Sequence, residues 1–167
     1  MSNIRFECVK DEHLRRITEI YNYYIKNTTV TFHYYEHTEE QMKEILYSKD
    51  PRFNSFAIID DNNGEVIGYC LICKFKNREA YNICGEVVLY LDNRYLGKGI
   101  GKKALDFLEE EAKKQKFHSL VASISGDNER SIGLFESQGY YKCAHFKEVG
   151  VKFDKFLDVL YYEKIIN

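Results

Sequence analysis

The feature that most constrains the fold is a cluster of three glycines between an apolar strand and an amphipathic helix. Gly97, Gly99 and Gly101 follow residues 81–91, which are rich in β-branched and aromatic side chains. The segment that begins among the glycines has apolar residues at helical spacing, namely Ile100, Ala104, Leu105, Leu108 and Ala112. Glycines let backbone amides approach an anion at the positively polarised start of a helix. This order therefore predicts a phosphate-binding turn, with a tight turn beside solvated lysines as the alternative.

Two common phosphate-binding patterns do not fit this turn. A Walker A motif would need a glycine and a hydroxyl residue at the places of Leu96 and Lys103. A dinucleotide-binding motif that starts at Gly97 and Gly99 would need its third glycine at Lys102. The sequence therefore indicates a different kind of phosphate-binding turn.

The other predicted elements alternate between strands and helices. Asp11 is predicted to cap the first helix, and Thr38 and Gln41 have the spacing of a capping box for a second helix that ends before Pro51. The patterns predict strands at 5–9, 53–59, 65–75, 81–91 and 120–125 and in a terminal pair over 140–162, and helices from 11, 38, 100 and 131. This order predicts an α+β fold with a mixed sheet. Because no linker rich in Pro, Gly or Ser interrupts the chain, we expect one domain over residues 1–167.

Composition restricts the partners and the compartment. The 24 Lys and Arg residues nearly balance 26 Asp and Glu residues, and the net charge of −2 argues against a basic surface for nucleic acid or anionic lipid. Five scattered cysteines do not suit a disulfide framework. A run of about 18 apolar residues, which a membrane span would need, is also lacking. We therefore expect a cytoplasmic protein without nucleic-acid or membrane partners.

Glu86 is the strongest candidate for acid–base chemistry. It stands within the apolar strand segment 83–90, one element before the glycine turn. Partial burial raises the pKa of a carboxyl group and suits it to act as a general base near neutral pH. Two alternatives stay open, a glutamate on a solvated face and one that is paired with Lys or Arg.

No metal site is predicted. Cys70 and Cys73 have CxxC spacing, but they lie within a strand, where residues three apart point to opposite faces. The five histidines show no zinc-like spacing: His13, His33, His37, His118 and His145.

Several segments together resemble the acetyl-CoA core of the GNAT acetyltransferases. They are the strand, the glycine turn at 97–101 and the helix, followed by residues 128–136 and by Gly139 and Tyr140. Within that superfamily the chain is similar, nearly end to end, to the phosphinothricin and methionine sulfoximine N-acetyltransferases. Four segments carry this closer similarity: residues 20–22 with 29–32, residues 75–81, residues 86–101, and residues 148–153 with 157–159.

The resemblance implies a GNAT-like fold, with a twisted, mostly antiparallel sheet flanked by helices and acetyl-CoA held where two central strands splay apart. Glu86 falls on the family's general base. The residues that the resemblance assigns to acetyl-CoA are Val88, Leu89, Tyr90, Leu96, Gly97, Lys98, Gly99, Ile100, Gly101, Asn128 and Ser131. Those that it assigns to the acceptor are Phe32, Lys76, Arg78, Gly85 and Val87. From its own pattern, Phe32 either packs in the core or lines a pocket.

The assigned residues have different roles in the resemblance. Residues 88–90 offer backbone groups to the pantetheine arm and the thioester, and residues 96–101 cradle the pyrophosphate. Lys76 and Arg78 hold a substrate carboxylate.

The sequence departs from the family at three places. Leu96 replaces the Gln or Arg that begins the pyrophosphate turn, and Arg94 is the candidate to compensate. Phe135 replaces a His or Tyr, so the general acid is unassigned, with solvent or Tyr140 as candidates. Residues 83–85 replace a bulkier Trp-Thr-Val, which predicts a reshaped acceptor pocket.

These features predict an acetyl-CoA-dependent N-acetyltransferase that acts on a small, amino-acid-like amine and uses no metal. The amine would attack the thioester directly once Glu86 has removed its proton. Acetylation of a protein N-terminus or of another amine, and a non-catalytic acyl-CoA-binding module, are the alternatives. The resemblance also suggests a homodimer.

Overall fold

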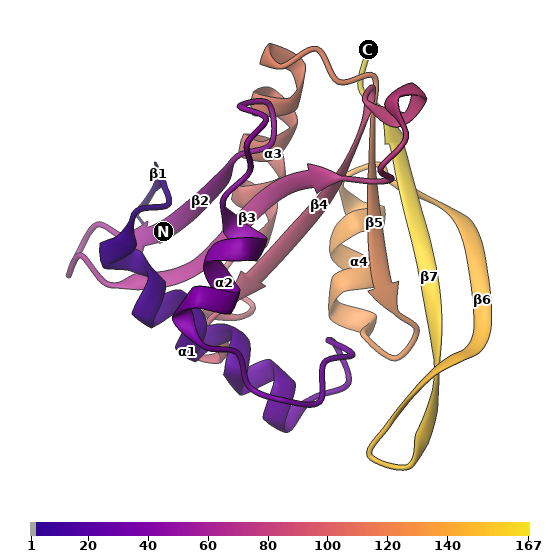
Figure 1. The fold of residues 1–167 in the computed structure, drawn as a ribbon, viewed down its shortest axis with the longest axis horizontal. Coiled ribbons are helices and arrows are strands. Elements are labelled where there is room, and N and C mark those ends of the chain that lie inside the picture. The colour runs from indigo at the N-terminus through magenta and orange to yellow at the C-terminus, as the bar shows by residue number, and fades with distance from the viewer. Residues whose placement is uncertain (1–2) are drawn as a thin grey trace.

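A computed structural model describes residues 3–167, so residues 1 and 2 of the predicted domain lie outside the described part. The described residues form one mixed sheet with the strand order β1-β2-β3-β4-β5-β7-β6 (Figure 1). Neighbouring strands pair antiparallel, except that β4 and β5 are parallel. The strands are β1 (Ile4–Cys8), β2 (Ser55–Asp60), β3 (Val66–Lys74), β4 (Cys84–Leu91), β5 (Ser119–Ser125), β6 (Tyr141–Lys152) and β7 (Lys155–Ile165). The predicted mixed, mostly antiparallel sheet is confirmed.

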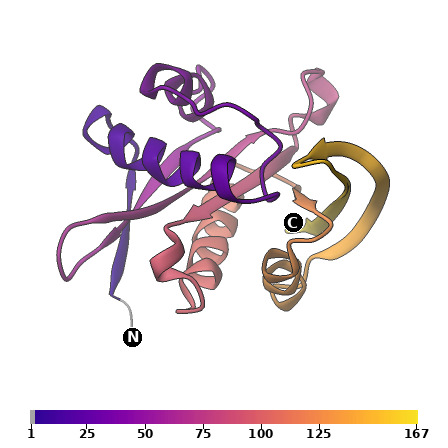
Figure 2. The same ribbon diagram turned by 90° about the horizontal axis from the view of Figure 1, so that it is seen from below.

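Helices cover both faces of this sheet. Helices α1 and α2 lie on one face, and α3 and α4 lie on the other (Figure 2). The bounds are α1 (Asp11–Asn27), α2 (Glu39–Leu46), α3 (Ile100–Lys114) and α4 (Glu129–Ser137), with short 3-10 turns η1 (Glu79–Tyr81) and η2 (Asn93–Tyr95). Within residues 3–167, none of the helices has the length and apolar character that a membrane span requires.

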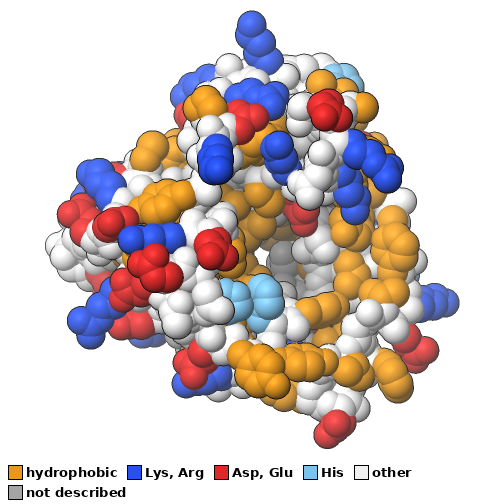
Figure 3. Space-filling model, viewed as in Figure 1, with side chains coloured by type: hydrophobic (Ala, Val, Ile, Leu, Met, Phe, Trp, Pro, Cys, Tyr) orange, Lys and Arg blue, Asp and Glu red, His pale blue; other side chains and the backbone are white. Residues whose placement is uncertain are grey.

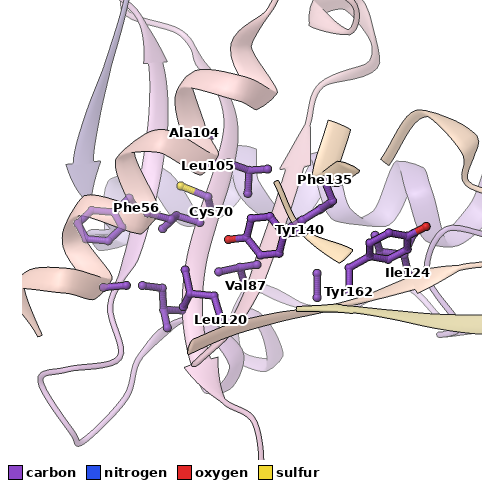
Figure 4. Packing of buried hydrophobic residues seen from close by; sticks show 14 of the residues in the cluster. Phe56, Cys70, Val87, Ala104, Leu105, Leu120, Ile124, Phe135, Tyr140 and Tyr162 are labelled. Carbon is purple, nitrogen blue, oxygen red and sulfur yellow. The ribbon is translucent and has the colours of Figure 1, made fainter. Parts of the chain in front are cut away.

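The two faces of the sheet carry separate hydrophobic cores. On the α3 and α4 face, Leu105 and Phe135 pack with Cys70 of β3 (Figure 4). On the α1 and α2 face, Leu14 and Met42 form the other core, and Cys73 packs against it. The two cysteines of the CxxC segment therefore belong to opposite faces, as the period of a strand requires.

The starts of the first two helices show one confirmed and one incorrect prediction. The Thr38 hydroxyl accepts from the Gln41 N–H at 3.2 Å, and the Gln41 side chain accepts from the Thr38 N–H at 2.9 Å, so the capping box at α2 is confirmed. The prediction that Asp11 caps α1 is wrong, because the helix already begins at Asp11 and Lys10 is the N-cap residue. Asp11 lies in the first turn, where its charge favours the helix dipole.

Strand β4 and helix α4 begin at other residues than the sequence predicts. The strand predicted from residue 81 starts at Cys84, because residues 79–82 form a 3-10 turn in which the Arg78 carbonyl accepts from the Tyr81 N–H at 3.0 Å. Helix α4 starts two residues before the predicted position, because the Asn128 side chain accepts from the Ser131 N–H at 3.2 Å and so caps the helix.

Candidate active site

The central feature of the site is the short pairing between the parallel strands β4 and β5. The pairing covers three positions: Cys84 with Ser119, Gly85 with Leu120, and Glu86 with Val121. Beyond these positions β4 stays paired with β3, and β5 stays paired with β7, so the two strands separate. Peptide groups on this edge of β4 then lack a neighbouring strand. The opening becomes a cavity of about 670 Å³ whose lining includes Glu86 at the last paired position.

The glycine turn forms one wall of the cavity. Gly97 and Gly99 have left-handed backbone angles, with φ of +74° and +76°, that other residues adopt only with strain. A Cβ atom at either position would meet nothing within 4 Å, so the glycines serve the backbone conformation and not close packing. At Gly101 the reason is space, since a Cβ atom there would lie 2.9 Å from the Leu134 side chain. Gly101 therefore allows the start of α3 to approach α4.

The start of α4 forms the facing wall. Asn128, Arg130 and Ser131 line the cavity, and the Asn128 side chain is used as the helix cap. Arg130 is a lining residue that the sequence analysis missed, because one basic residue in the first turn of a short helix carries no distinctive signal. Together with Lys102 it supplies the cationic side chains of the lining. Lys98 instead places its ammonium 4.7 Å from the centre of the Tyr95 ring.

Glu86 lies among neutral neighbours. Cys73 is its partner across the sheet on β3, and Val121 is its partner on β5. Burial in these surroundings raises the pKa of the Glu86 carboxyl, while the Lys76 ammonium acts in the opposite direction. Within residues 3–167 the carboxylate makes no hydrogen bond or ion pair, although it lines the cavity. The alternative of a glutamate paired with Lys or Arg therefore does not describe its environment, and the carboxylate is half-buried at the cavity wall.

The cavity opens toward a hollow on the α1 and α2 side. Figure 3 shows this hollow at the centre of the molecule, with hydrophobic side chains along its β6 and β7 side and histidine on the opposite side. The Phe75 and Tyr161 rings lie 6.3 Å apart and connect the end of β3 with β7. Phe32 contacts Gly150, where an added Cβ atom would lie 2.6 Å from the ring. These contacts join the end of β3 to β7 and the residue Phe32 to β6.

The connection between α1 and α2 runs across one end of this hollow. Its residues 28–35, which we call the strap, are anchored to the opposite half of the molecule at several points. The Thr29 hydroxyl donates to Asp127 at 2.6 Å, and the buried Lys152 ammonium donates to the Thr31 carbonyl at 2.8 Å. The Tyr34 hydroxyl also donates to the Val151 carbonyl. The strap therefore joins α1 to the β5–α4 turn and to the β6–β7 hairpin.

The structure brings most of the predicted cofactor residues to one cavity. The predicted residues that line it are Glu86, Val87, Val88, Leu89, Tyr90, Leu96, Gly97, Gly99, Ile100, Gly101, Asn128 and Ser131. Five predicted residues lie outside this lining: Phe32, Lys76, Arg78, Gly85 and Lys98.

Gly85 differs most from its predicted place beside the acceptor. A Cβ atom on Gly85 would lie 2.5 Å from the Ile72 side chain and 3.2 Å from Leu120. The glycine therefore faces the core on the α3 side, away from the hollow, because neighbouring residues of a strand point to opposite faces. Lys76 and Arg78 are exposed beyond the end of β3, and Lys76 is near enough to affect the pKa of Glu86.

Arg94 and Tyr140, the candidates to compensate for the departures at Leu96 and Phe135, have other contacts in the structure. Arg94 donates to Glu65 at 2.6 Å and to Asp92 at 2.7 Å, and it does not line the cavity. Tyr140 is buried against Phe135, with the ring centres 5.0 Å apart, and burial raises the pKa of its hydroxyl. Neither side chain reaches the cavity from its position.

This geometry fits a long ligand with phosphates at one end and a reactive group at the other. Backbone groups of β4, the glycine turn and two basic side chains line the same cavity as the candidate base. The sequence profile described as the Acetyltransferase (GNAT) family matches residues 17–140. The chain belongs to the GNAT acetyltransferase family.

This GNAT protein is 28% identical over 156 residues to a phosphinothricin N-acetyltransferase of Streptomyces coelicolor, a match that covers 92% of this chain and 91% of that relative. It is 28% identical over 148 residues to an L-methionine sulfoximine/L-methionine sulfone acetyltransferase of Salmonella typhimurium. That match covers 88% of this chain and 85% of that relative. A crystal structure of a phosphinothricin acetyltransferase from Sinorhizobium meliloti in complex with AcCoA matches with a TM-score of 0.92 and 28% identity, covering 99% of this chain and 89% of that chain.

The GNAT chain is thus an acetyl-CoA-dependent N-acetyltransferase, as the sequence predicts. Among residues 3–167, no cluster of three or more His, Cys, Asp or Glu side chains is arranged to hold a metal ion.

Proposed function

We propose that this acetyltransferase acetylates the amino group of a small amino-acid-like acceptor, of the phosphinothricin or methionine sulfoximine kind, with Glu86 as the general base. The similarity to enzymes named for these acceptors supports the substrate class. The observation that carries the proposal is the position of Glu86, an unpaired carboxylate where β4 and β5 separate and where the cofactor cavity opens toward the hollow.

Acetyl-CoA supplies, when bound, an acetyl group on a thioester. The groups of this chain that would hold it are the backbone of Val88, Leu89 and Tyr90, the turn at 96–101, and Asn128 with Ser131. A backbone N–H near Val88, in the part of β4 beyond its pairing with β5, would donate to the acyl oxygen.

The acceptor amine must lose a proton before its lone pair can react. An α-ammonium group has a pKa of about 8, so it is largely protonated at neutral pH. Glu86 accepts that proton, through a water molecule, in the site. Its raised pKa brings the carboxylate closer to the range in which a general base is efficient, and the Lys76 ammonium keeps it from being protonated too readily.

Two basic residues near the end of β3 provide a site for the acceptor's carboxylate. Lys76 and Arg78 are exposed in the segment that follows the strand, and the adjacent Phe75 ring lies 6.3 Å from the Tyr161 ring of β7. An acceptor with a carboxylate and an amine would thus extend from this basic segment to Glu86.

The test is release of CoA by the purified protein with acetyl-CoA and a panel of amines. We expect Glu86→Gln to lower kcat by about 10²- to 10⁴-fold at unchanged acetyl-CoA affinity, since it removes the proton acceptor and keeps the shape. Glu79→Gln, an exposed residue before β4, is the matched control and should act like wild type. Unchanged turnover in Glu86→Gln would show that the base is another group.

The same panel separates the alternative functions. Turnover with peptide N-termini and none with free amino acids would indicate a protein acceptor. Tight binding of acetyl-CoA without turnover of any amine would indicate an acyl-CoA-binding module, an interpretation that the buried Phe135, which cannot donate a proton, would then support.

A further inference from the structure

Ser123 of β5 lines the cavity on the same face of the sheet as Glu86. Glu86 and Val121 are register partners on parallel strands, so their side chains share a face, and Ser123 is two residues further on. The adjacent residues Ala122 and Ile124 belong to the core on the opposite face, which confirms the alternation. Ser123 therefore presents its hydroxyl on the side from which the acceptor approaches the base.

The Ser123 hydroxyl is also open to a ligand. The residue is exposed and lines the cavity, and its side chain makes no hydrogen bond within residues 3–167. Ser125, the next residue on this face, is different because its hydroxyl donates to Asp127 at 2.7 Å and it is outside the cavity lining. Of these two serines, Ser123 alone has a hydroxyl available to the cavity.

The spacing suits a small polar group between Ser123 and Glu86. A strand rises about 3.3 Å per residue, so Ser123 lies roughly 7 Å along β5 from the position that pairs with Glu86. The two strands separate over this distance, and the space between them belongs to the cavity. The cavity therefore leaves space between the two side chains, which an amino group, alone or with one water molecule, can occupy.

We propose that the Ser123 hydroxyl accepts a hydrogen bond from the acceptor's amino group and orients it while Glu86 removes its proton. This inference rests on the proposed function. An ammonium has three N–H groups, and after one proton has passed through water to Glu86 the neutral amine keeps two N–H groups and a lone pair. The lone pair must point to the thioester carbon, where the N–C bond forms as the C–S bond breaks. The electron pair of the C–S bond leaves on the CoA sulfur, and the nitrogen gives up one of its two remaining protons to that thiolate or to solvent, which leaves the amide N–H. A hydroxyl oxygen accepts from N–H in both charge states, so it holds the nitrogen throughout and exchanges no proton.

The experiment compares Ser123→Ala and Ser123→Thr with wild type, using the amine of the panel that wild type acetylates fastest. Loss of one neutral hydrogen bond predicts a decrease of about two- to tenfold in kcat/KM for the amine in Ser123→Ala. Ser123→Thr keeps the hydroxyl and should restore most of the rate. Acetyl-CoA affinity by calorimetry and the thermal unfolding midpoint should stay as in wild type. Ser119→Ala, on the same strand and face but outside the cavity lining, is the matched control.

A double variant separates a direct role from a structural one. If both residues hold the same amino group, Ser123→Ala should cost less in the Glu86→Gln background than in wild type. The inference is overturned if Ser123→Ala acetylates the amine like wild type, or if acetyl-CoA affinity falls by the same factor as kcat/KM. A failure of the proposed base is a distinct result, because Glu86→Gln alone would then leave turnover unchanged. The role of Ser123 would in that case be decided by the kcat/KM and the acetyl-CoA affinity of Ser123→Ala.

Discussion

The cavity beside the glycine turn and the neighbouring hollow, which we propose receives the acceptor, are built in different ways. The cofactor side consists of two helix starts, residues 96–102 before and within α3 and residues 128–131 at α4, together with the free edge of β4. The proposed acceptor side lies outside the lining of that cavity and would gather single side chains from distant parts of the chain, among them Phe32 in the strap, Phe75 after β3 and Tyr161 in β7.

The difference reflects what each side has to hold. The glycine turn works through backbone conformation and helix polarity, and both are properties of a contiguous segment. The proposed acceptor side would work through side chains whose neighbours are set by strand pairing and by the strap. Changes in the glycine turn should therefore affect acetyl-CoA binding alone, and changes around the strap should affect the acceptor alone.

The largest effect is expected from a charge in the glycine turn. Gly99→Glu places a carboxylate near the predicted pyrophosphate site and forces a non-glycine residue to a φ of +76°, so we expect acetyl-CoA to bind about 100-fold more weakly, or about 2.7 kcal/mol. Calorimetry measures the affinity of each variant for acetyl-CoA. Gly64→Glu is the matched control, because Gly64 has a φ of +72° and equally open space but lies in the β2–β3 turn. Equal affinity in Gly99→Glu and wild type would remove the turn from the cofactor site.

The next effect is expected at the anchor of the strap. Burial raises the pKa of Asp127, but hydrogen bonds from Thr29, Ser125 and Lys155 outweigh it and bring the pKa to about 2. Because this value lies below the ordinary 3.8, the ionised carboxylate stabilises the folded state above about pH 4, and this contribution is lost as the pH falls through 2. Asp127→Asn should lower the free energy of unfolding by about 1–2 kcal/mol at pH 7.

Urea unfolding at several pH values measures this contribution. The difference between Asp127→Asn and wild type should shrink between pH 4 and pH 2. Asp154→Asn, at the exposed tip of the β6–β7 hairpin, is the control and should change stability little at any of these pH values. A difference that stays constant down to pH 2 would mean that the charge of Asp127 does not stabilise the fold.

A smaller effect is expected from the aromatic wall. Phe32→Ala removes the ring that contacts Gly150, and we expect the KM for the acceptor amine to rise about threefold to tenfold while acetyl-CoA affinity is unchanged. Tyr35→Ala, which truncates a side chain that is 83% exposed in the same strap, should leave both constants as in wild type. A loss of acetyl-CoA affinity in Phe32→Ala would break the separation of the two sides.

The smallest effect is a displacement of the pH profile. The Lys76 ammonium lowers the pKa of Glu86, so Lys76→Gln should raise it and move the acid limb of kcat/KM to higher pH. Loss of the proposed contact with the acceptor's carboxylate lowers kcat/KM at every pH, so the position of the acid limb is read relative to the plateau of each variant. Lys74→Gln, whose ammonium lies over the Phe53 ring, is the control and should keep the wild-type profile. The opposite displacement, or none, would indicate that Glu86 is not the group that titrates.

Sequence-based prediction succeeded for features of a contiguous segment and failed for features that depend on residues far apart in the chain. The capping box of Thr38 and Gln41 and the glycine turn are local patterns, and each was predicted at its observed place. Gly85 was predicted beside the acceptor, but its neighbours Ile72 and Leu120 come from two other strands. Arg130 and Ser123 gave no signal, because nothing in a single basic or hydroxyl residue reveals that it will line a cavity.

The sequence by itself determined the order of the helices and strands, the conformation of the glycine turn and the presence of a carboxylate in an apolar strand. These depend on periodicity, capping and backbone preference, which act over a few residues. Tertiary structure decided where β4 and β5 separate, which face Glu86 shares with Ser123, and how the strap is anchored to the β6–β7 hairpin. Those outcomes arise from pairing between residues far apart in the chain, and no local pattern specifies them.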